Sequence, residues 1–220
     1  LSLAYKLGKG TQASLAYGIF YQNPERRYLP SPNALTFMKA THYIAQFQRS
    51  INQQTLRVEV FYKQYDNLVK TGVTNFTESA INNNGFGDAS GFEFFWRDKK
   101  TIKNFDYWVS YSYLDTKRDF LNFPFAITPN FAAKHTASLV AKKFVQQLKM
   151  NLNASYNYSS GRPYYNIGFD GTNYKFNDRG TIPDYHNVSF AINYLPKIGK
   201  KDAKSFAVYV LQVSNIFNIK

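Results

Sequence analysis

The side chains that can do chemistry are few in this 220-residue chain and are spread along it. The three histidines, His42, His135 and His186, fall in three separate segments without the short spacing that metal ligands share. The sequence has no Cys, which removes thiolate nucleophiles, disulfides and cysteine metal sites. Ser and Asp residues are present, but no spacing among them favours a catalytic triad. We therefore predict no catalytic residue, no metal site, no cofactor and no enzyme activity.

Glycine and lysine residues are the next candidates for chemistry. Gly85, Gly87 and Gly91 form no phosphate-binding loop, because they lie within strand alternation, where Gly indicates a bulge or close packing. Lys and Arg number 27 against 14 Asp and Glu, and the formal charge of +13 is a feature of many nucleic-acid-binding proteins. Many lysines instead gather in short predicted turns, as on a solvated rim, so we expect no nucleic-acid partner. These are Lys9, Lys99, Lys100, Lys103, Lys197, Lys200, Lys201 and Lys204.

Arginine occurs in three long predicted loops, at 22–38, 116–134 and 161–184, and tyrosine accompanies it in the first and the third. Paired hydrogen bonds from Arg and stacking on Tyr suit anionic or aromatic ligands such as iron chelates. The alternative is that these side chains are solvated or bind lipopolysaccharide phosphates. The candidate ligand-binding residues are Arg26, Arg27, Tyr28, Arg118, Asp119, Arg162, Tyr164, Tyr165 and Arg179.

The segment Leu148–Ser159 indicates which elements position these loops. Apolar and aromatic residues alternate with Lys, Asn and Ser throughout it, and a period of two is the strand period. Its length exceeds that of a globular strand of about 5–6 residues and matches the roughly 9–11 residues of a tilted membrane strand. We predict that one face contacts lipid and the other a watery lumen. The predicted lipid-facing residues are Leu148, Met150, Leu152, Ala154, Tyr156 and Tyr158.

The same alternation recurs and predicts ten strands, while no run of 18 apolar residues predicts a membrane-spanning helix. The strands are expected at 1–7, 11–21, 41–50, 55–66, 85–97, 105–115, 135–144, 148–159, 185–195 and 205–216. Their connections alternate between roughly 3–9 and roughly 17–24 residues, as the periplasmic turns and extracellular loops of outer-membrane barrels do. We predict an all-β, antiparallel, up-and-down transmembrane β-barrel. Its predicted lumen-facing residues are Arg57, Glu59, Lys63, Glu93 and Arg97.

Several short runs resemble TonB-dependent outer-membrane receptors, in particular those of Bacteroidetes. They are Tyr17–Pro24, Ala40–Tyr43, Glu59–Tyr65, Gly85–Gly87 with Gly91–Glu93, Trp108–Tyr113, Ser160–Tyr164 and Val213–Asn218. The likeness covers nearly the whole chain, and the order of the runs is more specific than any one of them. It implies a barrel of about 22 strands that is filled by an N-terminal plug and imports a scarce ligand with energy passed on by TonB. Residues 1–220 would then be a single barrel segment of about ten strands, with the plug, the TonB-contacting box and the closing strands elsewhere.

The resemblance also implies a location and partners. The location is the outer membrane of a Gram-negative cell, and the partners are outer-membrane lipid and lipopolysaccharide, the plug domain of the same parent chain, TonB and an unidentified small-molecule ligand. Two alternatives stay open. One is a plug-free, porin-like outer-membrane channel, and the other is a soluble, extended β-sheet binding protein whose apolar face is buried between sheets. Iron chelate, cobalamin and oligosaccharide importers share the wall pattern, so the pattern does not identify the ligand.

Overall fold

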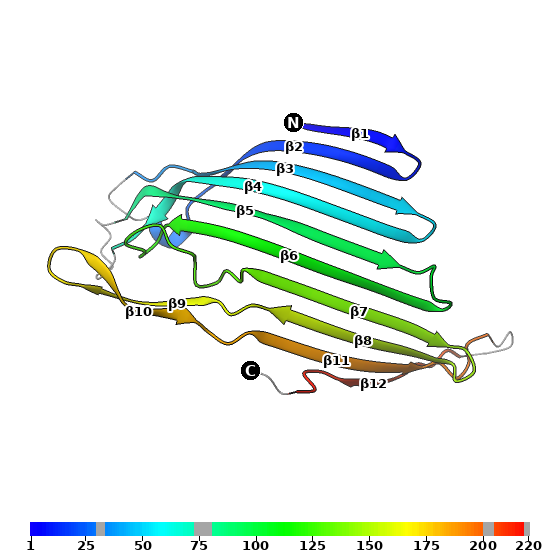
Figure 1. The fold of residues 1–220 in the computed structure, drawn as a ribbon. Helices are drawn as coiled ribbons and strands as arrows, with labels where there is room; N and C mark the ends of the chain where they lie inside the picture. Colours follow the sequence, from blue (N-terminus) through cyan, green and yellow to red (C-terminus); the bar gives the residue numbers. More distant parts are fainter. Residues whose placement is uncertain (30–33, 73–80, 200–204, 218–220) are drawn as a thin grey trace.

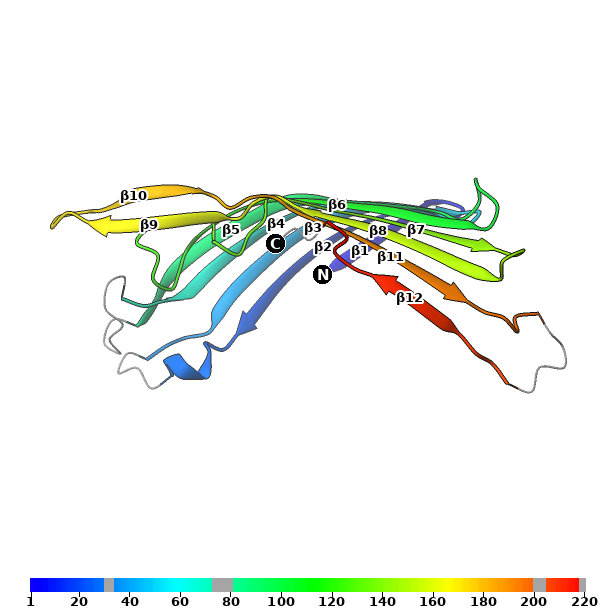
Figure 2. The same ribbon diagram turned by 90° about the horizontal axis from the view of Figure 1, so that it is seen from below.

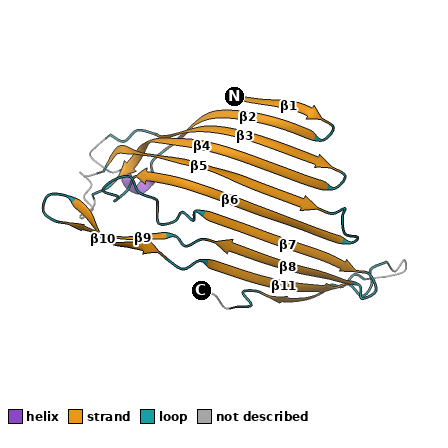
Figure 3. Ribbon diagram, viewed as in Figure 1, coloured by secondary structure: helices purple, strands orange, loops and turns teal. Residues whose placement is uncertain are grey.

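The computed structural model describes residues 1–29, 34–72, 81–199 and 205–217, and strands dominate them (Figures 1 and 3). Ten strands form one antiparallel sheet in which neighbours along the chain are neighbours in space, except that β8 is followed by β11. In order across the sheet they are β1 (Ser2–Gly8), β2 (Thr11–Gln22), β3 (Met38–Ile51), β4 (Gln54–Lys70), β5 (Asn82–Asp98), β6 (Phe105–Asp119), β7 (His135–Val145), β8 (Met150–Ser159), β11 (Tyr185–Tyr194) and β12 (Tyr209–Val213). The predicted all-β, up-and-down arrangement of ten strands is confirmed.

The predicted loop 161–184 is wrong, because it contains a β-hairpin. Strands β9 (Pro163–Phe169) and β10 (Tyr174–Thr181) pair with each other as a separate two-stranded sheet that extends beyond the long-loop rim (Figure 1). The turn is built locally: the Asp170 carboxylate accepts hydrogen bonds from the backbone N–H groups of Thr172 and Asn173. Gly171 supplies the positive φ of 97° that the turn requires.

Several predicted strand ends also need correction. Strands β4, β5 and β6 run farther toward the long loops than alternation suggested, so Arg118 and Asp119 end a strand and do not lie in a loop. Charged residues hide the apolar alternation there, but the backbone pairing continues past them. At the opposite rim, Leu148 lies in the turn before β8, so it is not part of the predicted lipid-facing strand. Strand β12 is shorter than the predicted range of 205–216.

The register places the two kinds of side chain on opposite faces of the sheet. Glu59 lies opposite Glu93, which lies opposite Ser112, and the same line continues through Thr136 to Ser159. The predicted lumen-facing residues share this polar face, since they sit an even number of residues from Glu59 or Glu93. The predicted lipid-facing residues of β8, from Met150 to Tyr158, have the other parity and share the apolar face.

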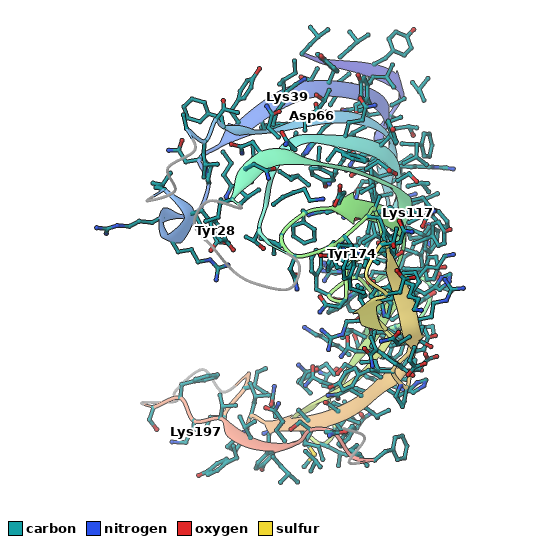
Figure 4. The ribbon with its side chains drawn as sticks, turned by 90° about the vertical axis from the view of Figure 1, so that its left-hand side faces the viewer. Tyr28, Lys39, Asp66, Lys117, Tyr174 and Lys197 are labelled. Carbon is teal, nitrogen blue, oxygen red and sulfur yellow. The ribbon has the colours of Figure 1, made fainter. Side chains whose placement is uncertain are left out.

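The sheet is arched (Figure 2), and seen from the long-loop rim it forms an open arc (Figure 4). Tyr28, on the short 3-10 helix η1 (Arg26–Tyr28), lies in the hollow of this arc (Figure 4). The pocket that Tyr28 lines also contains Tyr65 and Arg118 of the polar parity, so the polar face is the concave one. On the convex face, Leu3 is 67% exposed and Leu15 is 60% exposed. Among the described residues, no helix is long and apolar enough to span a membrane.

Short turns join the strands at the other rim, on the right of Figure 1. Asn52 and Gln53 both adopt positive φ, which is the geometry of a two-residue turn that matches the twist of its strands. The predicted turn lysines Lys9, Lys99, Lys100, Lys103 and Lys197 lie between strands at this rim. Lys200, Lys201 and Lys204 lie outside the described residues.

Candidate functional site

Three connections at the long-loop rim meet over a small apolar core. Tyr28, Val69 and Ile81 are 5%, 4% and 1% exposed, and they form its buried centre. Tyr28 comes from the β2–β3 connection, Val69 from the end of β4, and Ile81 from the residue before β5. Leu35, Met38 and Leu121 pack against them. Burial of these side chains holds the connections against the sheet, on its concave side.

Backbone hydrogen bonds fix the β6–β7 connection to the same place. The N–H of Leu121 donates to the carbonyl of Val69 at 2.7 Å, and the N–H of Thr71 donates to the carbonyl of Leu121 at 2.8 Å. Farther along, Arg118 and Ile127 exchange two backbone hydrogen bonds of 2.8 and 3.1 Å. The connection therefore folds back onto the end of the sheet.

A pocket of about 490 Å³ lies between the three long-loop connections and the polar face of the sheet. Its volume falls within the range of small-molecule sites, roughly 300–1,000 Å³. Its lining combines aromatic, aliphatic and a few charged side chains. The lining residues are Phe20, Tyr21, Gln22, Glu25, Tyr28, Met38, Lys39, Ala40, Tyr65, Leu68, Val69, Arg118, Phe120 and Leu121.

Arg118 is the central polar group of the pocket. Its guanidinium carbon lies 4.2 Å from the centre of the Tyr65 ring and 5.6 Å and 6.0 Å from the centres of Phe131 and Phe120. Such cation–π contacts contribute about 0.5–2 kcal/mol each, more when water is excluded. The Nε atom of Arg118 is buried and has no hydrogen-bond partner among the described residues. An aromatic clamp thus holds a donor that no described group satisfies.

Gly87 makes this arrangement possible. In the register, Tyr65 lies opposite Gly87, and Gly87 lies opposite Arg118, so a glycine separates the ring from the guanidinium. A Cβ atom at Gly87 would come within 2.8 Å of the Arg118 Cγ and 2.6 Å of the Lys117 carbonyl oxygen. Without a side chain at Gly87, Arg118 crosses β5 and reaches Tyr65. Of the two predicted roles for this glycine, a bulge or close packing, the contacts support close packing.

The other charged groups around the pocket have partners. Lys70 Nζ lies 2.5 Å from the Asp119 carboxylate, and the two side chains are only 20% and 13% exposed. Lys39 is 3.3 Å from Asp66. Glu25 and Arg27 form a 2.9 Å ion pair on the exposed side of the β2–β3 connection.

The structure brings only some of the predicted ligand-binding residues together. Tyr28 and Arg118 line the pocket, and Asp119 is held next to it by Lys70. Arg26 and Arg27 are the exposed residues of helix η1, and the Arg27 guanidinium carbon is 4.7 Å from the centre of the Tyr28 ring.

The remaining predicted residues belong to the β9–β10 hairpin and not to the pocket. Arg162 precedes β9 and is exposed. Tyr165 and Arg179 both contact Phe176, with the Tyr165 ring centre 5.4 Å away and the Arg179 guanidinium carbon 5.2 Å away. Tyr164 lies opposite Gly180 in the hairpin register.

Sequence reasoning missed the groups that make Arg118 distinctive. Tyr65, Gly87, Phe120 and Phe131 are not among the predicted ligand-binding residues, and neither is Lys70. The signal for the first two was the alternation itself: both lie within the predicted strands at 55–66 and 85–97, each an even number of residues from Glu59 or Glu93. Phe131 gives no such signal, because its place depends on how the β6–β7 connection folds back.

Elsewhere on the polar face, the predicted lumen-facing residues make contacts of their own. Arg97 donates two hydrogen bonds to Asp106, at 2.9 and 2.6 Å. Glu59 accepts one from Gln46 at 3.0 Å. The charged ends of Arg57 and Lys63 lie 5.6 and 4.8 Å from the ring centres of Phe95 and Phe61. Glu93 lines a shallow groove with Ser and Thr side chains of β6 and β7.

The three histidines lie on three different strands, β3, β7 and β11. His42 packs on Phe20 of the polar face, with ring centres 4.7 Å apart. His135 and His186 lie on the apolar face, where their Nδ1 atoms hydrogen bond to the hydroxyls of Tyr111 and Tyr156 at 2.7 and 2.8 Å. Within the described ranges, no three His, Asp or Glu side chains gather as metal ligands.

Comparisons with known proteins agree on the fold. A family model described as TonB dependent receptor-like, beta-barrel matches residues 3–218. The ferric citrate transporter FecA in its unliganded form superposes on 98% of the chain with a TM-score of 0.74 and 17% identity. The outer membrane transporter YddB from Escherichia coli superposes on 98% of the chain with a TM-score of 0.75 and 9% identity. The ferripyoverdine receptor of Pseudomonas aeruginosa superposes on 98% of the chain with a TM-score of 0.73 and 11% identity. The chain spans 32%, 36% and 28% of those three structures. No curated protein sequence matches it.

Proposed function

We propose that this chain, which belongs to the TonB-dependent receptor-like β-barrel family, forms a section of the wall of an outer-membrane receptor that imports a scarce ligand such as an iron chelate. In this proposal the convex face contacts outer-membrane lipid and lipopolysaccharide, and the concave face lines a lumen that holds the plug domain of the parent chain. TonB supplies energy through another part of that parent. The section acts in transport and not as an enzyme. The Bacteroidetes type of receptor stays a prediction.

The exposed apolar face is the observation that carries this proposal. Leu15 and Val60 are 60% and 50% exposed, and they lie among many other exposed apolar and aromatic side chains of the same parity. A surface of this extent is costly in water, at about 25 cal/mol per Å² of apolar area. A soluble sheet protein would cover it with a second layer, and no second layer covers the sheet in the described part of the chain. Lipid is the environment that suits this face, provided that the strands belong to a closed barrel.

The arrangement of the sheet places the long loops and the pocket at the same rim. The short turns lie at one rim, and the pocket and the β9–β10 hairpin lie at the other (Figure 1). In outer-membrane barrels the long-loop rim faces the exterior. The pocket at the end of β4–β6 would then meet incoming ligand before it reaches the plug. Names of similar structures, which include a ferric citrate transporter and a ferripyoverdine receptor, support a metal chelate as that ligand.

A spin-label scan of β8 in the full-length parent, refolded into bilayers, tests the membrane part of the proposal. Each residue from Met150 to Ser159 is changed to Cys and labelled, and collisions with oxygen and with a polar nickel complex are recorded. Oxygen collisions should peak at Met150, Leu152, Ala154 and Tyr156, and nickel collisions at the positions between them. If neither oxygen nor the nickel complex collides with labels on the apolar face of β8, protein covers that face and the membrane proposal is wrong.

Uptake measurements then separate an energised receptor from a porin-like channel. Cells that produce the parent protein are given radioactive iron as a panel of chelates, with and without a functional TonB. Uptake should depend on TonB and stay saturable at low chelate concentration. Uptake that continues unchanged without TonB would favour the plug-free channel.

A further inference from the structure

We propose that the Arg118 pocket binds a flat, ring-bearing carboxylate with a single negative charge, either as a free molecule or as one arm of a larger ligand. This proposal rests on the proposed function, because it concerns what the long-loop rim of the wall captures. It adds a chemical class and assigns Arg118 as the residue that determines specificity.

The charges around the pocket set the charge of the ligand. Lys39 is paired with Asp66, Lys70 with Asp119, and Glu25 with Arg27. No described carboxylate lies within ion-pair distance of Arg118, so among the described residues its positive charge has no counter-ion. A ligand with one negative charge would balance it. A second negative charge would enter an apolar space without a partner, at a high desolvation cost.

The unsatisfied donor sets the type of anion. The Nε–H of Arg118 is buried and has no hydrogen-bond partner among the described residues. A planar guanidinium binds a carboxylate through two parallel hydrogen bonds, one of which can come from Nε. A carboxylate in this position would satisfy a donor that is otherwise costly to bury.

The rings around Arg118 set the shape of the ligand. Tyr65 lies on one side of the guanidinium at 4.2 Å, and Phe120 lies at 6.0 Å. The lining also includes the aliphatic side chains of Leu68, Val69 and Leu121. A ring attached to the carboxylate would leave the guanidinium and continue along aromatic and aliphatic walls, where offset stacking and apolar burial favour it. A compact hydrophilic anion such as phosphate would gain none of this.

Three naphthalene probes that differ in charge test the proposal on the full-length parent in lipid nanodiscs. The probes are 2-naphthoate, 2-naphthalenemethanol and 2-naphthylmethylammonium, and calorimetric titration measures their affinities after subtraction of empty nanodiscs. The naphthoate should bind at least about tenfold more tightly than the alcohol, the range expected for a hydrogen bond to a charged group. The ammonium should bind more weakly than either.

Substitutions then locate the binding. Arg118→Met should lower the naphthoate affinity by about 10–100-fold and leave the alcohol nearly unchanged. Arg118→Lys keeps the charge but removes the Nε–H and the planar fork, so it should lose most of the preference as well. Arg57→Met is the matched control, because Arg57 lies on the same face and also contacts a ring, that of Phe95, outside the pocket.

A second route avoids changing Arg118, in case its replacement prevents folding. Gly87→Ala places a Cβ atom against the Arg118 Cγ and should move the guanidinium from Tyr65. The naphthoate affinity should then fall by several-fold while the charge stays constant. Equal affinities of the three probes for the wild type, or an equal loss in Arg57→Met, would overturn the proposal. Such a result leaves the β8 scan and TonB-dependent uptake unaffected, so it is distinguishable from failure of the proposed function.

Discussion

The two halves of the sheet build the same two-faced wall but end differently at the long-loop rim. Strands β3–β6 have 14–17 residues, whereas β7, β8 and β11 have 10–11. A tilted strand needs about 9–11 residues to cross a bilayer, so only the first half runs well past that length. At about 3.3 Å per residue, the excess extends the first half by roughly 10–20 Å. That extension supplies the sheet on which the connections fold and the Arg118 pocket forms.

The second half sends its longest connection away from the wall instead. The β9–β10 hairpin closes on itself, and Phe176 meets Phe125 of the β6–β7 connection edge to face, with ring centres 5.1 Å apart. The polar faces differ as well. The first half presents charged residues such as Arg57 and Glu59, whereas β8 of the second half presents Asn and Ser, from Asn151 to Asn157. Strand length therefore decides whether a wall strand also contributes to a site.

The largest expected effect comes from a substitution that buries a charge in the apolar core beneath the loops of the first half. In Val69→Asp a carboxylate without a partner is buried at a position that is 4% exposed, which costs about 4 kcal/mol. We expect the connections to detach, and hydrogen exchange at 25–29 and 121–127 to rise by on the order of 10²–10³-fold. Exchange in the β9–β10 hairpin should not change.

The matched control is Val140→Asp, which places the same substitution on the polar face of β7. Water would solvate that carboxylate in a lumen, so exchange at both sites should stay close to the wild type. Equal acceleration in both variants would mean that the two halves do not unfold independently at this rim.

Loss of the half-buried ion pair should have the next largest effect. Asp119→Asn leaves the Lys70 ammonium without its counter-ion at the end of the long strands, at a cost of about 2–3 kcal/mol. Lys175→Met breaks the corresponding hairpin contact, where Lys175 and Asp170 are 3.8 Å apart and more exposed. Exposed pairs contribute little. Local stability from hydrogen exchange should fall at 118–127 in the first variant and hardly change at 170–175 in the second.

Glycine substitutions compare the packing of the wall with that of the hairpin. A Cβ at Gly91 of β5 would lie 2.1 Å from the Tyr113 carbonyl oxygen, so the neighbouring backbone must move. We expect Gly91→Ala to cost roughly 1–3 kcal/mol in urea unfolding of the refolded parent. At Gly168 of β9 the nearest atom, 2.4 Å away, belongs to the mobile end of the Asn177 side chain. Gly168→Ala should therefore cost much less, and a larger loss there than at Gly91 would contradict the comparison.

Most of the wall was predictable from the sequence because alternation is a property of every membrane-type strand. The polar face of Arg57, Glu59 and Lys63 follows from period two alone, and the register confirms that they share a face with Glu93. The ends of the strands were not predictable in the same way. Past Asp66 and Asp115 the alternation of apolar residues stops, and ion pairing and the small buried core continue the strands instead.

The hairpin and the pocket show two different limits. The hairpin carried a local signal, since Asp170-Gly171 lies between runs of Tyr, Ile and Phe, which is a hairpin pattern. The length of the connection hid it. Only part of the pocket was predictable from the sequence. Tyr28 and Arg118 were predicted from their residue types, but Phe131 contacts Arg118 only because the β6–β7 connection folds back. The local alternation of residues does not predict such long-range contacts.

The smallest expected effect concerns Asp184, which ties the hairpin to the second half of the wall. Its carboxylate accepts hydrogen bonds from the Gly161 backbone N–H and the Tyr158 hydroxyl, both at 2.8 Å. These bonds, the one from Gly161 first, hold the pKa of Asp184 below its ordinary value. Stabilisation by a carboxylate of lowered pKa is complete above its unfolded pKa, near 4, and is lost as the pH falls through the folded pKa.

Acid should therefore loosen the base of the hairpin. A nitroxide at Arg162→Cys, in the full-length parent in bilayers, should become more mobile as the pH falls from 5 to 2.5. With Asp184→Asn added, the label should be mobile at every pH, because the neutral amide accepts more weakly and does not titrate. A label whose mobility ignores both the acid and Asp184→Asn would mean that the Phe125–Phe176 contact, and not Asp184, anchors the hairpin.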